Sequence, residues 1–225
     1  MTATDPGLLN LRWSQTLVDA LAGVGLRDVF LSPGSRSSPL ALAFMRQPAV
    51  RCQVILDERS AAFCALGMAK ATRQAVALLC TSGSAPANWF PALIEADLGA
   101  VPLLLLSADR PPELLGWGAN QTIDQQQLFG RHVRSFYAPP LPDADFSPAY
   151  LQRLAARAMA DSRWPLPGPV HLNLAFREPL LPTGDLLARH AGTTCSSAVG
   201  VAAPLLMPTR QAIAETLAEI SARPG

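Results

Sequence analysis

Residues 75–80 (AVALLC) and 102–106 (PLLLL) are apolar at every position. Neither segment shows the alternation of apolar and polar residues that marks a strand with one face in water. Uniformly apolar runs of this length are typical of strands in a parallel sheet that helices cover on both faces. We therefore predict an α/β fold in which both segments are buried strands.

Helical and strand patterns alternate through most of the remaining sequence. Predicted helices cover residues 11–21, 39–45, 59–72, 85–97 and 150–162, and further strands cover residues 28–31, 53–56 and 170–174. This order predicts a doubly wound, mostly parallel sheet with helices on both faces. Ligands of such sheets bind at the carboxyl ends of the strands, so the residues that follow each strand are the first candidates for a site.

The chain of 225 residues divides into three predicted parts. Residues 1–182 form the α/β domain, which includes a Pro-, Gly- and Gln-rich stretch, residues 107–142, too long to be an idle connection. Residues 183–208 are rich in small side chains and are predicted to be a linker. Residues 209–225 contain a predicted helix over 209–222, and we interpret them as the start of a truncated central domain.

Composition and charge argue against several classes of function. Hydrophobic residues make up 49% and charged residues 16% of the chain, so a buried core is available. The net charge of +1 argues against nucleic acid as the main partner. No apolar run approaches the roughly 20 residues that span a bilayer and no signal peptide is evident, so we expect no membrane insertion.

The four cysteines show no CxxC pairing and no histidine at metal-ligand spacing. We therefore expect no metal site within this chain, and reduced thiols in the cytoplasm. The sequence also lacks a GxGxxG segment, a P-loop and a GxSxG elbow. A Rossmann dinucleotide site, a nucleoside triphosphatase and an α/β-hydrolase are therefore poorly supported.

Glu58 follows one predicted strand and precedes a predicted helix. One interpretation is a first-turn acid that complements the helix dipole, an effect worth about 0.3–1 kcal/mol. The other is a carboxyl group that hydrogen-bonds a ligand nitrogen in a water-poor cleft. Asp57 is the better candidate for the helix cap because its side chain can accept a helix N–H, and this would leave Glu58 free.

Ser35 and Arg36 lie in a predicted loop between a strand and a helix. Backbone N–H groups at such a junction attract anions, and Arg36 could add a bidentate grip on a carboxylate. The alternative is a Pro-Gly turn that carries a surface arginine. The residues alone leave both interpretations open.

Arg110 comes almost directly after the apolar strand over residues 102–106, and the two prolines behind it restrict its loop. A charged residue at the carboxyl end of a strand is a candidate for ligand binding in this architecture. Asn120 and Gln121 lie in the same irregular loop and could bind hydroxyl or carboxylate oxygens. The alternative for each is an ordinary loop amide.

Several segments, in this order, resemble one enzyme family. They are residues 32–40 (SPGSRSSPL), 57–61 (DERSA), 65–70 (ALGMAK), 81–85 (TSGSA), 108–114 (ADRPPEL), 118–125 (GANQTIDQ) and 168–173 (GPVHLN). Together they resemble the 2-succinyl-5-enolpyruvyl-6-hydroxy-3-cyclohexene-1-carboxylate synthases of menaquinone biosynthesis, in the N-terminal, pyrimidine-type domain of these thiamin-diphosphate enzymes. The likeness extends from about residue 11 to residue 182.

The resemblance implies a transferase that decarboxylates 2-oxoglutarate and adds the succinyl semialdehyde carbanion to isochorismate. The implied catalytic residue is Glu58, hydrogen-bonded to nitrogen N1′ of the cofactor's aminopyrimidine ring. The implied cofactor-binding residues are Glu58, Thr81, Ser82 and Gly83. The implied binding residues for isochorismate, a dicarboxylate that suits guanidinium groups, are Ser35, Arg36, Arg110 and Gln121.

One element of this family is missing from the sequence. The family binds Mg²⁺ and the diphosphate through a Gly-Asp-Gly motif followed later by Asn, whereas Gly184-Asp185 is followed here by Leu186 and no Asn occurs after Asn173. The resemblance therefore implies that metal and diphosphate are anchored outside this chain. It also implies an active site between subunits of a homodimer or homotetramer, and a chain that is inactive by itself.

Two other functions remain open from the residues. A non-catalytic α/β module that binds a small carboxylate or pairs with another subunit would use Arg36 and Arg110 but would give Glu58 no role. A different thiamin-diphosphate carboligase or decarboxylase would use Glu58, and would need neither arginine for isochorismate.

Overall fold

A computed structural model describes residues 5–182, 184, 199–200, 202 and 207–222. Six strands form one sheet in the order β2-β1-β3-β4-β6-β5. The strands are β1 (Asp28–Leu31), β2 (Arg51–Val54), β3 (Val76–Cys80), β4 (Leu103–Asp109), β5 (Ser135–Tyr137) and β6 (Pro169–Ala175). Every strand pairing in the described residues is parallel. The predicted α/β fold is confirmed.

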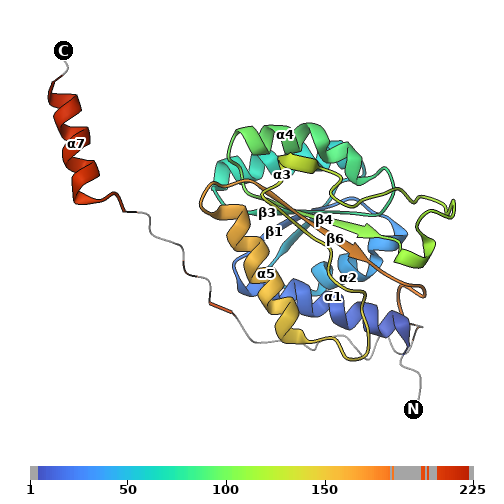
Figure 1. Cartoon of the computed structure of the whole chain (residues 1–225). Helices are drawn as coiled ribbons and strands as arrows, with labels where there is room; N and C mark the ends of the chain where they lie inside the picture. Colours follow the sequence, from blue (N-terminus) through green and yellow to red (C-terminus); the bar gives the residue numbers. More distant parts are fainter. Residues whose placement is uncertain (1–4, 183, 185–198, 201, 203–206, 223–225) are drawn as a thin grey trace.

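Helices cover both faces of the sheet (Figure 1). On one face lie α1 (Pro6–Gly23), α2 (Ser38–Arg46) and α5 (Pro148–Arg163). On the other lie α3 (Glu58–Thr72) and α4 (Phe90–Leu98). A separate hydrophobic cluster fills the space between the sheet and each helix layer.

Strand β3 shows why its sequence is apolar at every position. Ala77 and Leu79 belong to the cluster packed against α1, α2 and α5, whereas Val76 and Leu78 belong to the cluster packed against α3 and α4. Successive side chains of a strand point to opposite faces, so a strand between two helix layers must be apolar on both. None of the four is more than 1% exposed.

The strand order reverses its direction between β1 and β3. From β1 the chain runs outward to β2 and then returns to β3 on the other side of β1. The loop after β1 leads to α2 on one face, and the loop after β3 leads to α4 on the opposite face. Ligands of open α/β sheets bind between two loops that part in this way. One of these loops carries Ser35 and Arg36, and the other carries Thr81, Ser82 and Gly83.

Some boundaries differ from the sequence predictions. Strand β4 continues to Asp109, because it stays paired with β6 through Ala175. The edge strand β5 lies inside the stretch predicted to be irregular. The predicted helix over residues 85–97 begins as a 3₁₀ turn, η2 (Pro86–Trp89), before α4.

The segment after β6 returns to the first helix. The Asn10 side chain donates hydrogen bonds to the main-chain oxygens of Arg177 at 2.8 Å and Pro179 at 3.1 Å. The predicted linker lies largely outside the described residues. Beyond it, α7 (Arg210–Ser221) forms where a helix was predicted, and none of its side chains is buried. Among the described residues, no helix has the length and apolarity needed to cross a membrane.

Candidate active site

The loops after β1 and β3 touch at Gly34. A Cβ atom at this position would lie 2.3 Å from Cβ of Thr81, so only glycine allows the approach. Gly83 adopts a φ of +81°, and its N–H donates a hydrogen bond to Oε1 of Gln125 at 2.8 Å. The backbone of the β3 loop is therefore held on two sides.

Ser82 joins Arg110 and Gln121 in one hydrogen-bonded cluster. Arg110 Nη1 donates to the Ser82 hydroxyl. That hydroxyl donates to the main-chain oxygen of Gln121 at 3.1 Å, and Gln121 Nε2 donates to the main-chain oxygen of Ser82 at 3.2 Å. Three predicted site residues from separate segments of the chain thus lie together.

Arg36 is buried, with only 4% of its surface exposed. Its Nη1 donates to the main-chain oxygen of Phe176 at 2.9 Å, and its Nη2 pairs with Oε1 of Glu178 at 2.7 Å. Its Nε is buried and has no hydrogen-bond partner in the described structure. The alternative of a surface arginine in a Pro-Gly turn does not fit this burial. The Glu178 partner was not found by sequence reasoning.

Arg110 and Arg36 lie close enough to repel each other. Burial, and then the charge of Arg36, lower the pKa of Arg110, while Glu178 and Asp109 partly oppose this effect. Two neighbouring guanidinium groups, of which one is paired with the exposed Glu178 carboxylate, are electrostatically suited to an anionic ligand.

A buried polar network lies beneath this cluster. Asn173 Nδ2 donates to Oδ2 of Asp109 at 2.7 Å, and its Oδ1 accepts from Ser107 Oγ at 2.9 Å and from Gln125 Nε2 at 2.8 Å. Ser107 Oγ also lies 2.7 Å from Nε2 of His171. Because the single hydroxyl proton of Ser107 goes to Asn173, His171 must be the donor in this last bond.

The network connects the strands to both sides of the site. Asp109 accepts the main-chain N–H of Arg110 at 2.7 Å, and Gln125 accepts that of Gly83 at 2.8 Å. Asn173 therefore holds both Asp109, which binds the N–H of Arg110, and Gln125, which binds the N–H of Gly83. The sequence does not single out Asn173 or Gln125 as site residues, because nothing local reveals a contact between residues far apart in the chain.

His171 is neutral inside the sheet, because burial lowers its pKa from 6.5 to about 3. In the unfolded chain it takes up a proton below pH 6.5, whereas in the folded chain it does not. Its contribution to stability is therefore complete above pH 6.5 and is lost as the pH falls, by about 1.4 kcal/mol per pH unit until about pH 3. His171 therefore serves the structure of the sheet.

We predict that His171→Gln removes this pH dependence. Between pH 6.5 and pH 5.0 the wild-type free energy of unfolding should fall by about 2 kcal/mol more than that of the variant. Urea unfolding of both proteins across this range measures the difference. Parallel stability curves for the two proteins would show that the imidazole takes up its proton at the same pH in the folded and the unfolded chain.

Glu58 is the first residue of α3 and is half-buried. Asp57 caps the helix by accepting the N–H of Ser60 at 2.7 Å, as predicted. Within the described chain, the Glu58 side chain forms no hydrogen bond or ion pair. After the larger effect of burial, its charge helps to raise the pKa of the Cys80 thiol, so the carboxylate lies near the end of β3.

Exposed apolar side chains flank Glu58 in the sequence. Val54 at the end of β2 is 57% exposed, Leu56 is 82% exposed and Phe63 on α3 is 45% exposed. The carboxylate therefore borders an edge of the domain whose apolar groups face water. Such groups are typical of a surface that another protein segment covers.

The comparison with known proteins identifies the family. The profile described as "Thiamine pyrophosphate enzyme, N-terminal TPP binding domain" matches residues 11–128. The chain belongs to the thiamine pyrophosphate enzymes. The match includes β1 to β4 and every sequence-predicted site residue of this thiamine pyrophosphate domain, whereas Asn173 and Glu178 lie beyond it.

Curated relatives of this domain carry the name 2-succinyl-5-enolpyruvyl-6-hydroxy-3-cyclohexene-1-carboxylate synthase. The one from Dechloromonas aromatica is 48% identical over 222 residues, 99% of this chain and 41% of its own length. The one from Roseiflexus castenholzii is 56% identical over 183 residues, 79% of this chain and 32% of its own. The chain thus spans about two fifths or less of the length of these relatives.

The predicted site residues of the thiamine pyrophosphate domain fall into two groups. Ser82, Gly83, Arg110 and Gln121 lie together, with Thr81 against Gly34 and Arg36 within electrostatic reach. Ser35 is exposed in the loop after β1. Glu58 lies at the same carboxyl edge of the sheet, and no hydrogen bond joins it to the Ser82 cluster. Among the described residues, no three histidine, cysteine or acidic side chains are grouped to hold a metal ion.

Proposed function

We propose that this domain binds the aminopyrimidine ring of thiamin diphosphate and contributes to a synthase acting on 2-oxoglutarate and isochorismate. The observation that carries the proposal is the Glu58 carboxylate, which lies at the carboxyl edge of the sheet and forms no hydrogen bond or ion pair with any other described residue. Membership of the thiamine pyrophosphate enzymes supports the cofactor. The names of the curated relatives support the substrates.

Glu58 fits the role of partner to a ring nitrogen. When bound, thiamin diphosphate supplies a nucleophilic carbon and an electron sink for decarboxylation. Glu58 would hydrogen-bond nitrogen N1′ of the ring and hold a proton at that atom. Because Asp57 caps α3, the helix does not need the Glu58 carboxyl group. A subunit that covers Val54 and Leu56 would exclude water and strengthen the hydrogen bond.

The cluster around Ser82 fits the binding of a dicarboxylate. We propose that Arg110, Arg36, Gln121 and Ser35 bind isochorismate, and that Thr81, Ser82 and Gly83 line the pyrimidine end of the cofactor. A carboxylate of the substrate would offset the repulsion between the two guanidinium groups. In the described structure the Glu178 carboxylate pairs with the Arg36 guanidinium as a substrate carboxylate would.

The metal site, the diphosphate site and the oligomeric state of the synthase are also proposals. We propose that Mg²⁺ and the diphosphate are bound by a C-terminal domain of a facing subunit in a homo-oligomer, so that the 225-residue chain alone is inactive. The predicted boundaries of the linker, at residues 182 and 208, stay predictions. Free thiols at Cys52, Cys64 and Cys80 are consistent with the cytoplasm as its compartment.

The test is a kinetic one on the longer protein that contains this domain. Arg110→Gln should raise the KM for isochorismate about 10- to 100-fold, because a charged hydrogen-bond donor worth about 1.5–3 kcal/mol is lost. The KM for 2-oxoglutarate should stay near the wild-type value. Arg131→Gln, which removes an exposed arginine outside the cluster, is the matched control.

The outcomes separate the three functions. Absence of turnover by the wild-type protein with these two substrates contradicts the proposed synthase. Turnover of 2-oxoglutarate combined with an unchanged KM for isochorismate in Arg110→Gln favours a different thiamin-diphosphate carboligase. The non-catalytic alternative is tested at Glu58.

A further inference from the structure

A cavity lies at the amino-terminal edge of the sheet. It has a volume of about 560 Å³ and is formed by the end of α3, the turn between α4 and β4, and the turn between α5 and β6. Its walls immediately precede β3, β4 and β6. The seven residues of β4, at about 3.3 Å each, separate it by roughly 20 Å from the candidate active site.

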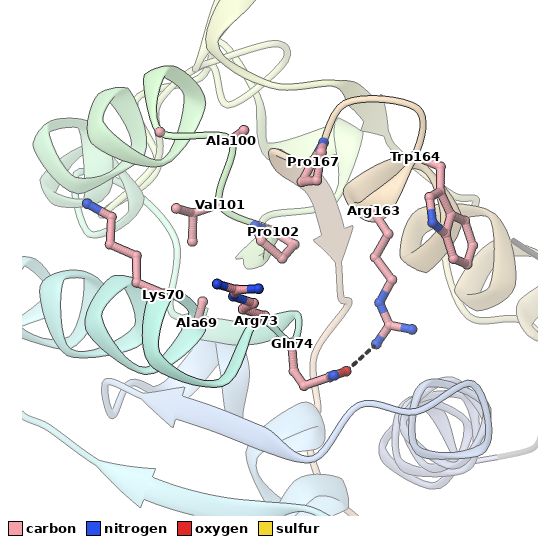
Figure 2. A pocket seen from close by; sticks show the side chains of 11 residues that line it. Ala69, Lys70, Arg73, Gln74, Ala100, Val101, Pro102, Arg163, Trp164 and Pro167 are labelled. Carbon is pink, nitrogen blue, oxygen red and sulfur yellow. Dashed lines mark hydrogen bonds between the residues drawn. The ribbon is translucent and has the colours of Figure 1, made fainter. Parts of the chain in front are cut away.

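Of the described residues that line this cavity, three are cationic and none is acidic. Figure 2 shows Lys70 and Arg73 extending from α3, and Arg163 extending from the end of α5 toward Gln74. Within the described residues, the side chains of Lys70 and Arg73 form no hydrogen bond or ion pair. The Arg163 guanidinium makes one weak contact, at 3.5 Å, with Oε1 of Gln74.

Among the described residues, no acidic side chain pairs with Arg163, although the Arg163 side chain is half-buried. Burial, and then the charge of Arg27, lower the pKa of Arg163, which shows that its surroundings disfavour the cation. A partly buried charge without a counter-charge is costly, and an anion placed beside it recovers part of that cost.

Cations at the ends of helices have an ordinary explanation, because the carboxyl end of a helix carries a partial negative charge. Three helices, α3, α4 and α5, end at this cavity. Their ends contribute about −0.5 each, or about −1.5 together, against +3 from the side chains. Asp97, in the last turn of α4, is already bound by Arg134 and His132. The cavity therefore keeps a net positive charge.

The other walls are apolar and suited to the body of a small molecule. Val101, Pro102, Trp164 and Pro167 contribute them. Cavities of about 300–1,000 Å³ with apolar walls and a few convergent polar groups are typical of sites for metabolites. We propose that this cavity binds a small organic anion through a carboxylate or phosphate group held by Arg73 and Arg163, with Lys70 at the opposite side of the cavity (Figure 2).

The first test is a titration of the isotope-labelled 225-residue chain with two probes, inorganic phosphate and citrate. Saturable shifts are expected at the backbone amides of Gly99 and Ala100 and at the indole N–H of Trp164. Saturation by either probe supports the site and identifies the group it prefers. Shifts confined to Gly83 and Arg110, or no saturable shift with either probe, would overturn it.

The second test uses variants. Arg73→Asn combined with Arg163→Gln should raise the Kd of the saturating probe at least about tenfold, a loss of about 1.4 kcal/mol. Asn is chosen because Arg73 has a φ of +55°, which asparagine tolerates. Arg73→Asn alone changes only an exposed side chain, so it reports on binding even where the double variant does not fold.

Matched controls locate the site. Arg153→Gln removes one exposed positive charge from α5 outside the cavity and should leave the Kd unchanged. Arg110→Gln removes a cation from the carboxyl edge of the sheet and should also leave it unchanged. An equal Kd in the wild-type chain and the Arg73 variants would place the bound anion elsewhere and refute the proposal.

Discussion

Glu58→Gln should lower the kcat of the complete synthase by about 10²- to 10⁴-fold, the range typical of a lost general acid–base group. The amide keeps the size of the side chain but cannot hold the proton that the cofactor nitrogen shares. Because Glu58 forms no hydrogen bond or ion pair within the part of the chain that the structure describes, the fold should be little affected, with a change of at most about 1 kcal/mol from the helix dipole. Steady-state turnover of 2-oxoglutarate with isochorismate, together with urea unfolding, measures both effects.

Asp57→Asn is the control for this experiment. Asparagine is as good a helix cap as aspartate, so the bond to Ser60 and the start of α3 should persist. The variant removes a neighbouring charge and should keep turnover within a few-fold of wild type. Near-normal turnover of Glu58→Gln would remove the basis of the proposed mechanism and favour the non-catalytic module.

Asn173→Leu should lower the free energy of unfolding by about 3 kcal/mol or more. Asn173 is 3% exposed, and its amide serves Ser107, Asp109 and Gln125. Leucine has a similar size but leaves these three buried groups with fewer partners, at about 1–3 kcal/mol for each group left unsatisfied. Urea unfolding of the 225-residue chain measures the loss.

Asn120→Ala is the matched control for Asn173→Leu. Asn120 lies exposed in the loop after β4, so its removal should change the free energy of unfolding by less than about 0.5 kcal/mol. A loss below about 1 kcal/mol in Asn173→Leu would show that the network contributes little to stability and that the loops are held by other contacts.

The central strands were predictable from the sequence because their environment is the same on both faces. Residues 75–80 and 102–106 are apolar throughout, and β3 and β4 are buried on both sides. The end of β4 was not predictable, since Ser107 and Asp109 look like loop residues until their partners on β6 are known. The three-residue edge strand β5 has too little pattern of its own.

The site was predictable where a local rule applied. The cap at Asp57 follows from one strand-to-helix turn, and the placement of Arg110 follows from the end of one strand. The partner of Arg36 was not predictable, because 142 positions separate it from Glu178. Gln125 was missed for the same reason, since its bond to Gly83 spans 42 positions.

The grip of Arg36 on Phe176 and Glu178 also limits how far the domain can be shortened. A chain ending before Phe176 would leave a buried guanidinium without its acceptor and its counter-ion. It would also deprive Asn10 of both its acceptors, Arg177 and Pro179. The shortest chain that can fold by itself therefore has to retain the segment after β6, because this segment is hydrogen-bonded to both α1 and the loop after β1.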